Sequence, residues 1–271
     1  MIGLPEATYH YHVKKFNTVD PDQPMRELIK ELFYQFKERY GYRRITTELK
    51  TLGHEINHKK VYRLMKEMGL KCMKYMHKSR RYNSYKGRVG KVARNRLNRR
   101  FDTPYPLQKV ATDITEFKCT DDKKLYLSPI LDLCNGEIIT FGIGDRPGHE
   151  LVMRPLEEAV GIINEHARFR TTIHSDQGWH YQHRDWVKTL KQHKIYQSMS
   201  RKATCADNAS MENFFGLLKQ EMYYGEARLS YNELKSKITE YIDWYNHIRS
   251  KEKLGGLSPV EYRNKTIQLA E

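Results

Sequence analysis

The chain has 271 residues and a formal net charge of +15, and its 19 tyrosines, 9 phenylalanines and 3 tryptophans argue against general disorder. No apolar stretch reaches the ~18–20 residues that cross a bilayer, and the N-terminus lacks a signal-peptide pattern, so we expect no membrane association. The 4 cysteines form no Cys-x-x-Cys pair, which excludes a disulfide framework and a cysteine zinc cluster.

The positive charge is concentrated in the first part of the chain. Residues 1–110 contain 26 Lys and Arg against 10 Asp and Glu, a net of +16, whereas residues 111–271 contain 22 against 23, a net of −1. Such asymmetry indicates a polyanionic partner, most simply nucleic acid, bound mainly by the N-terminal part. A charge excess that serves only solubility is the alternative interpretation.

Three short helices are predicted near the N-terminus. The first two cover residues 25–39 and 43–52, and the third lies between Asn57 and Gly69. Gly41, Gly53 and Gly69 follow the three helices and favour helix termination, because glycine tolerates the left-handed conformation. Asn57 is a suitable N-cap for the third helix.

We interpret residues 1–70 as a small all-α, helix-turn-helix-like DNA-binding region, because the third helix is short and basic. Its predicted DNA contacts are Lys59, Lys60 and Arg63. Any small three-helix bundle has a similar pattern, so the net charge is what favours DNA binding.

A basic linker is predicted at residues 71–103. Residues 68–101 carry twelve basic residues and no acid, with too few apolar residues for a core. We expect this segment to lie along DNA phosphates and release counterions, with Arg80 and Arg81 among its contacts. A merely solvated connector is the alternative.

The second half of the chain predicts an α/β fold. Strands are expected at residues 110–117, 125–133, 137–144, 171–174 and 195–199, and helices at 149–165, 184–193, 207–223 and 231–247. Three antiparallel strands followed by alternating helices and strands predict a mixed five-stranded sheet with flanking helices.

Three acids from distant segments are candidate metal ligands. Asp113 lies in the first strand, Asp176 follows the fourth, and Glu212 lies one turn into a helix. Converging carboxylates repel one another unless a cation binds between them, and hard oxygen ligands suit Mg²⁺ or Mn²⁺. Two such ions catalyse phosphodiester chemistry. Each acid alone has an ordinary solvated or turn-forming role, and Glu116 and Asp132 are rival acids on the same sheet.

Several segments together resemble a known family. They are "QKVATDITEF" (108–117), "TIHSDQGWHYQ" (172–182), "SMSRKATCADNASMENFFGLLKQE" (198–221) and "YIDWYNHIRSKEKLGGLSPVEY" (241–262). With "GLPEATYHYHVKKF" and "RYGYRRITTEL" near the N-terminus, they resemble DDE transposases of the ribonuclease H-like and retroviral integrase superfamily. The closer resemblance is to the second-frame product of bacterial insertion sequences that use programmed frameshifting.

The resemblance implies roles for particular residues. Asp113, Asp176 and Glu212 match the metal-binding triad, and the 35 residues between the last two match the family's spacing. DNA contacts are implied for Lys219, Asn208 and Lys202. The implied boundaries are an integrase-type, ribonuclease H-like catalytic core at 104–265 and a tail at 266–271. His174, beside the second motif, is interpreted as a packed, hydrogen-bonded histidine, with assistance to the site as the alternative.

The implied function is that of a transposase, a polynucleotidyl transferase that cleaves DNA and transfers strands with Mg²⁺ or Mn²⁺, using two ions. The implied partners are element ends and target DNA, further copies of the chain on DNA, and the upstream first-frame product or a frameshift fusion with it. We expect it in the bacterial cytoplasm, on the nucleoid. The alternatives are a catalytically inactive or repurposed DNA-binding protein and a nuclease of the same fold that only hydrolyses.

Overall fold

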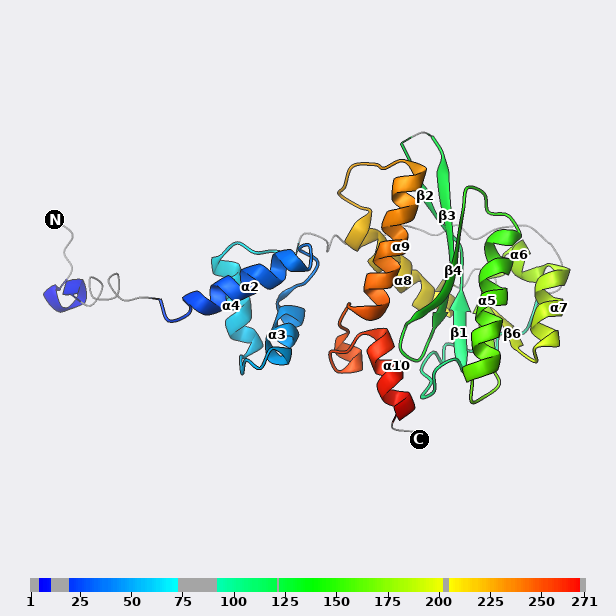
Figure 1. Cartoon of the computed structure of the whole chain (residues 1–271), viewed down its shortest axis with the longest axis horizontal. Helices are drawn as coiled ribbons and strands as arrows, with labels where there is room; N and C mark the ends of the chain where they lie inside the picture. Colours follow the sequence, from blue (N-terminus) through cyan, green and yellow to red (C-terminus); the bar gives the residue numbers. More distant parts are fainter. Residues whose placement is uncertain (1–4, 11–19, 73–91, 121, 202–204, 269–271) are drawn as a thin grey trace. The chain divides into compact units, whose positions relative to one another are not determined.

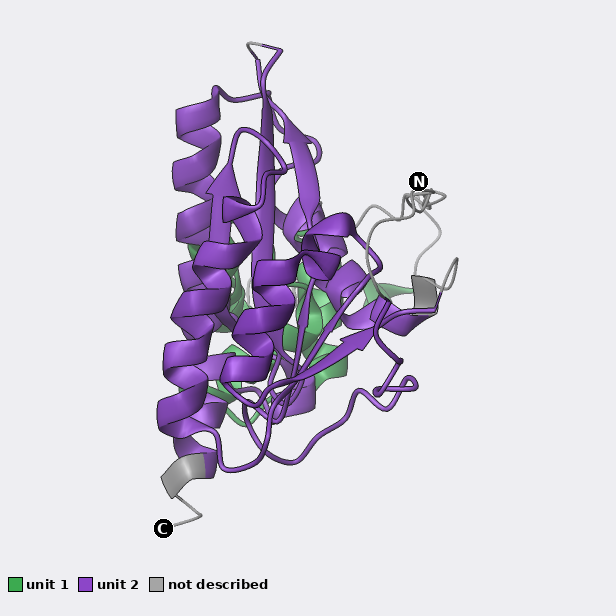
Figure 2. Ribbon diagram, turned by 90° about the vertical axis from the view of Figure 1, so that its right-hand side faces the viewer, with its two compact units in different colours: residues 1–74 green, residues 75–271 purple. Residues whose placement is uncertain are grey.

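A computed structural model of the chain describes residues 5–10, 20–72, 92–120, 122–201 and 205–268. It contains two compact units, residues 1–74 and residues 75–271, which Figure 2 colours separately. Within the described residues, every helix is too short or too polar to cross a lipid bilayer.

The first unit is a bundle of the three predicted helices (Figure 1). These are α2 (Gln23–Gln35), α3 (Tyr42–Thr51) and α4 (His58–Glu67). Each is amphipathic, with apolar residues at helical spacing that point inward. The buried side chains are Ile29, Leu32, Phe33, Ile45, Leu49, Val61, Leu64 and Met65.

The first helix ends earlier than predicted, at Gln35, and Gly41 is not its stop signal. Lys37 and Glu38 adopt φ values of 52° and 59°, so the chain turns through two non-glycine left-handed residues. Gly41 instead lies in extended conformation as the N-cap residue of α3. The sequence misled here because glycine also serves at helix starts.

The other predicted helix boundaries are confirmed. Gly53 and Gly69 follow α3 and α4 with φ values of 87° and 69°, the left-handed conformation expected after a helix. The side chain of Asn57 accepts a hydrogen bond of 2.9 Å from the backbone N–H of Lys59, which caps α4.

The second unit is built on one mixed sheet. Its strands are β1 (Lys109–Thr112), β2 (Thr115–Lys118), β3 (Lys124–Asp132), β4 (Ile138–Gly144), β5 (Thr172–Ser175) and β6 (Tyr196–Met199). β3 pairs antiparallel with β1, β2 and β4, whereas β1, β5 and β6 run parallel to one another. The predicted α/β class is therefore confirmed.

The sheet has six strands rather than the five predicted, because the first predicted strand is broken at Asp113 and Ile114. β1 and β2 keep the same register against β3, which places Pro129 opposite Asp113. Proline has no N–H to donate, so the hydrogen-bond ladder is interrupted beside this acid. The interruption coincides with the first candidate metal ligand.

Helices cover both faces of the sheet (Figure 1). α5 (Glu150–His166) and α7 (Arg184–Gln192) lie on one face, and α8 (Ala209–Met222) and α9 (Tyr231–His247) on the other. Among the described residues of the second unit, two α-helices were not predicted: the short α6 (Trp179–Gln182) and α10 (Pro259–Gln268), which packs on α9. Because α10 continues to Gln268, the predicted core boundary at residue 265 falls inside a helix.

Each face of the sheet has its own hydrophobic core. Ala111 and Phe117 pack with side chains of α8 and α9, whereas Val110 and Ile173 pack with side chains of α5 and α7. The alternation predicted for residues 110–117 is therefore confirmed, since successive side chains reach opposite faces. The same alternation directs Asp113 towards the face covered by α8.

The C-terminal family signature at residues 241–262 has a structural role. The side-chain amide of Asn246 accepts from the backbone N–H of Ile138 and donates to its carbonyl, each at 2.9 Å, which pairs the start of the edge strand β4. Arg249 forms an ion pair with Glu221 of α8, and both side chains are buried. These contacts tie the end of α9 to the sheet and the segment after α9 to the helix that carries Glu212.

Candidate active site

The parallel pairing of β1 with β5 brings Asp113 and Asp176 together. Lys109 pairs with Thr172 and Ala111 with His174, a constant offset of 63 residues. The same offset sets Asp113 beside Asp176 (113 + 63 = 176), immediately past the carboxyl ends of both strands. Functional groups gather at this edge of α/β sheets because neighbouring strand ends open there together.

Asp113 lies at the centre of the acidic group. Its Oδ1 accepts a hydrogen bond of 2.8 Å from the backbone N–H of Ile114. Burial, followed by the negative charges of Asp176 and Glu212, raises the pKa of this carboxyl well above its usual range. The three predicted acids therefore converge on one region, although their oxygens do not all lie within 4.8 Å of one another.

A glycine holds the Asp176 carboxylate. The backbone N–H of Gly178 donates to Asp176 Oδ1 at 2.8 Å. A Cβ atom on Gly178 would lie 2.9 Å from that same oxygen, so a larger residue would displace the carboxylate. Glycine at position 178 thus allows the backbone to approach the Asp176 carboxylate closely.

Glu212 enters the site from the first turn of α8, where it is exposed. Asn208 is the N-cap residue of that helix, but its side chain does not cap it. It is buried instead, with Nδ2 at 3.4 Å from Asp113 Oδ2 and 3.5 Å from the Thr112 carbonyl oxygen. The helix start is therefore tied to the first strand of the site.

Lys219 lies two turns after Glu212 and reaches the same site. Its Nζ donates to Thr115 Oγ1 at 2.6 Å and lies 5.0 Å from the centre of the Phe117 ring. Its positive charge opposes the rise in the Asp113 pKa. The side chain that the family resemblance assigned to DNA thus sits beside the acidic group.

The remaining predicted DNA contacts have different surroundings. Lys59 is exposed on α4, whereas Lys60 and Arg63 form ion pairs of 2.6 and 2.7 Å with Asp22 of the same unit. A DNA phosphate would have to compete with Asp22 for Lys60 and Arg63. The role of these residues as DNA contacts stays a prediction. Three of the predicted contacts lie outside the described residues: Arg80, Arg81 and Lys202.

The two rival acids have structural partners. Glu116 is exposed and pairs with Lys124 at 3.1 Å. Asp132 is buried and accepts hydrogen bonds from the backbone N–H groups of Leu107 at 2.7 Å and Cys134 at 2.9 Å. Its burial raises its pKa to about 6. Asp132 therefore braces the end of β3 and the segment before β1.

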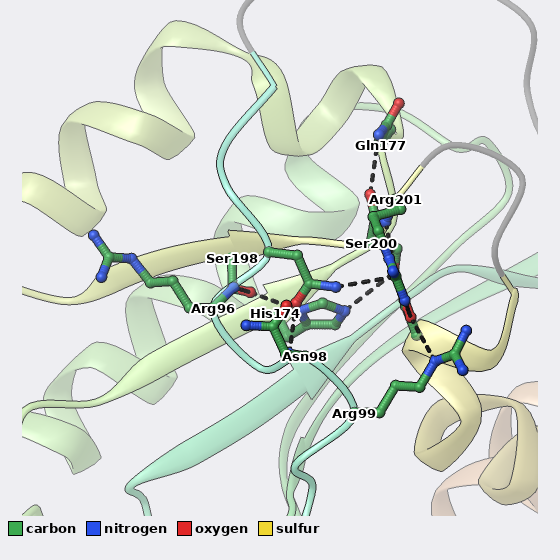
Figure 3. Close-up of polar contacts among 10 residues, drawn as sticks. Arg96, Asn98, Arg99, His174, Gln177, Ser198, Ser200 and Arg201 are labelled. Carbon is green, nitrogen blue, oxygen red and sulfur yellow. Dashed lines mark hydrogen bonds and ion pairs between the residues drawn. The ribbon is translucent and has the colours of Figure 1, made fainter.

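His174 is a packed, fully hydrogen-bonded residue, as interpreted from the sequence. It is completely buried, with Nδ1 at 2.8 Å from Ser198 Oγ and Nε2 at 3.1 Å from Ser200 Oγ (Figure 3). Burial lowers its pKa to about 4, so the imidazole is neutral at pH 7. Its contact with Ser198 links β5 to β6, two residues before Asp176 in the chain.

This buried histidine is expected to make the fold acid-sensitive. The pKa of His174 is about 4 in the folded state against an ordinary value of 6.5. Its contribution to stability is therefore complete above pH 6.5 and is lost as the pH falls through 4, a loss of about 3 kcal/mol. Urea unfolding at pH 7 and pH 4 measures this loss. In the variant His174→Gln, the free energy of unfolding should change less between pH 7 and pH 4 than in the parent. An equal change in both proteins would contradict the lowered pKa of His174.

Asp207 organises the loop that precedes Glu212, a role that the sequence analysis did not identify. Its buried carboxylate accepts hydrogen bonds from the side chains of Arg201 (2.9 Å), Arg99 (3.1 Å) and Asn95 (3.0 Å). The Arg201 hydrogen bonds come first among the causes that lower its pKa. No local pattern signals this network, because its donors come from segments about one hundred residues apart.

The last part of the predicted linker packs against the rest of the second unit. The backbone N–H of Arg96 donates to Ser198 Oγ at 2.8 Å, and Leu97 is buried. Lys109 Nζ donates to the carbonyl oxygens of Arg100 and Asp102. The predicted linker boundary at residue 103 stays a prediction, although Ala93 and Arg96 of that segment contact other parts of the second unit.

Comparison with known families follows the same division of the chain. Residues 21–79 match the HTH-like domain family, and residues 104–205 and 212–267 match two families described as integrase core domain. Among solved structures, the HTLV-2 integrase catalytic core domain in complex with magnesium aligns at 13% identity and a TM-score of 0.45, over 59% of this chain and 97% of that one.

Curated relatives match nearly the whole chain. The putative transposase InsK for insertion sequence element IS150 of Escherichia coli is 44% identical, over 97% of this chain and 91% of that protein. The transposase InsF for insertion sequence IS3A of the same organism is 34% identical, over 87% of this chain and 80% of that protein. This chain therefore belongs to the family of insertion-sequence transposases, polynucleotidyl transferases with an integrase core domain that move DNA.

Proposed function

We propose that this transposase cleaves and joins DNA with divalent cations, Mg²⁺ or Mn²⁺, held by Asp113, Asp176 and Glu212. The observation that carries the proposal is that Asp113 and Asp176 lie at adjacent strand ends with Glu212 of α8 near them. Burial, and then the charges of Asp176 and Glu212, raise the pKa of Asp113 there. An all-oxygen donor set of this kind fits hard cations. We propose two ions, as phosphodiester transfer commonly uses.

When bound, such ions supply activation of the attacking oxygen and stabilisation of the leaving oxygen of the phosphodiester. The protein's own residues orient the ligands. The Ile114 and Gly178 backbone N–H groups fix the Asp113 and Asp176 carboxylates, and Asn208 holds the start of α8 against β1. Lys219 supplies a positive charge beside the acids, suited to a DNA phosphate.

No amino-acid nucleophile is needed in this mechanism. Tyr181 lies near the acids, but burial and then the charges of Asp113 and Asp176 raise its pKa well above the usual value. Its phenol therefore stays protonated and serves in packing. A DNA 3′-hydroxyl generated by cleavage attacks the target phosphodiester directly, so the ends are joined without a covalent protein–DNA intermediate.

We further propose that the basic N-terminal unit contacts DNA through Lys59, Lys60 and Arg63, and that Arg80, Arg81 and Lys202 add phosphate contacts. Element ends and target DNA are bound by a homo-oligomer that assembles on DNA. The upstream first-frame product, separately or as a frameshift fusion, supplies recognition of the ends. The reaction takes place in the bacterial cytoplasm, on nucleoid DNA.

A strand-transfer assay tests this proposal and separates its alternatives. The substrate is a labelled DNA duplex that carries the terminal repeat from the flanks of the gene, either intact or pre-cleaved to expose the 3′-hydroxyl. A transposase joins the pre-cleaved end to a target plasmid when Mg²⁺ or Mn²⁺ is present. Cleavage without joining would instead identify a nuclease, and binding without either reaction a DNA-binding regulator.

A further inference from the structure

A second group of potential metal ligands lies apart from the three acids. Among the described residues, only His149, His183 and Asp185 form a group of at least three His, Cys, Asp or Glu side chains whose ligand atoms all lie within 4.8 Å of one another. The two imidazole rings are 4.1 Å apart between centroids, and His183 Nδ1 lies 3.4 Å from Asp185 Oδ2. None of these residues belongs to the acidic group of the proposed active site.

One nitrogen atom among these three side chains is buried without a hydrogen-bond partner in the described part of the chain. His149 Nε2 is buried and has no hydrogen-bond partner among the described residues. A buried polar atom without a partner is costly, so it indicates a ligand at this position. The residues themselves are only partly buried, which leaves a route for an ion from solvent.

We propose that His149, His183 and Asp185 form a binding site for a transition-metal dication, with Zn²⁺ as the best match. Two imidazoles and one carboxylate are a typical three-ligand zinc set, with water in the fourth position of the tetrahedron. The nitrogen ligands distinguish this site from the all-oxygen group of Asp113, which suits Mg²⁺ or Mn²⁺.

The ion would join the starts of two helices. His149 is the N-cap residue of α5 and His183 that of α7, and both helices pack on the same face of the sheet. Helix N-termini carry partial positive charge, which opposes a cation. The carboxylates of Asp185 and Glu150, in the first turns of these helices, offset that charge.

The site also connects with the loop that holds Asp176. His180 of α6 lies with Nε2 2.6 Å from the carbonyl oxygen of Pro147, two residues before His149. A metal that fixes His149 against α7 would therefore restrain both the segment before α5 and α6. We assign the ion a structural role, since none of its ligands is among the three candidate catalytic acids.

Zinc titration of the metal-free full-length chain tests the site. We expect one tightly bound Zn²⁺ per chain at this site, with an increase in thermal stability, and tetrahedral d–d absorption when Co²⁺ replaces Zn²⁺. The variants His149→Ala and His183→Asn should lose the spectrum and weaken binding at least about 100-fold. Asparagine at position 183 keeps an acceptor for the Asp185 N–H, so it removes a ligand and retains the helix cap.

Two further variants make the test specific. His166→Ala removes an exposed histidine at the other end of α5 and should leave zinc binding unchanged. Asp113→Asn alters the proposed magnesium site and should also leave zinc binding unchanged. The result of the zinc titration is therefore independent of the proposed function. Zinc binding that is equally tight in the parent and in His149→Ala, or no binding by the folded parent, would overturn the proposal.

Discussion

Replacing Asp176 with asparagine is expected to reduce DNA cleavage and strand transfer at least about a thousandfold, while DNA binding and folding persist. The reason is that a neutral amide replaces one of three converging carboxylates, so the cation that they hold is lost or misplaced. Metal catalysis supplies several kcal/mol of transition-state stabilisation, and each 1.36 kcal/mol corresponds to a factor of ten in rate. The measurement is the single-turnover rate on labelled element ends in Mg²⁺ and in Mn²⁺.

Glu116→Gln is the matched control for this prediction. Glu116 is also an acid on the sheet, but it is exposed and paired with Lys124, so its substitution should leave the rate unchanged. Comparable losses in both variants would show that the acids of the sheet act through their overall negative charge rather than as individual metal ligands. Full activity of Asp176→Asn would remove the assignment of this acid as a metal ligand.

The second large effect concerns stability rather than chemistry. Arg249→Met is expected to destabilise the second unit by about 3–5 kcal/mol, because it leaves the buried Glu221 carboxylate without its cation. Arg249 donates to both carboxylate oxygens, at 2.6 Å from Nη2 to Oε1 and 2.9 Å from Nε to Oε2. The loss should appear as a lower urea midpoint at pH 7.

Tryptophan fluorescence is the suitable probe, because all 3 tryptophans of the chain lie in residues 75–271 and report on the second unit alone. The double variant with Glu221→Leu removes both charges and should unfold at a higher urea concentration than Arg249→Met. Lys253→Ala, which breaks the exposed pair with Asp102, should lower the urea midpoint far less than Arg249→Met does. Equal effects of the buried and exposed pairs would contradict this account.

The class of fold could be predicted because its signals are local. Period-two alternation in residues 110–117 depends only on neighbouring residues, and it is found in the structure. The break at Asp113 could not be predicted, because it coincides with Pro129 on the neighbouring strand. The helix stop at Lys37 and Glu38 was missed because non-glycine residues there adopt positive φ.

The three acids lie near one another as the sequence analysis expected, whereas their role as metal ligands stays a prediction and the contacts that hold them were not predicted. Spacing and family resemblance singled out Asp113, Asp176 and Glu212 from the rival acids, and the parallel register then explains why the first two are neighbours. The contacts that hold them come from tertiary structure. The Asn208 side chain contacts Asp113 and does not cap α8, because the end of β1 lies beside the start of this helix.

The buried carboxylate of Asp207 also determines where this protein can be truncated. A fragment that starts at residue 104 would remove the Asn95 and Arg99 donors, and Ser198 would lose the N–H of Arg96. The loop that leads into α8 would then depend on Arg201 alone among these side chains. Recombinant fragments of the second unit should therefore begin no later than Val92. A chimaera that replaces the first unit should be joined at a residue before Val92.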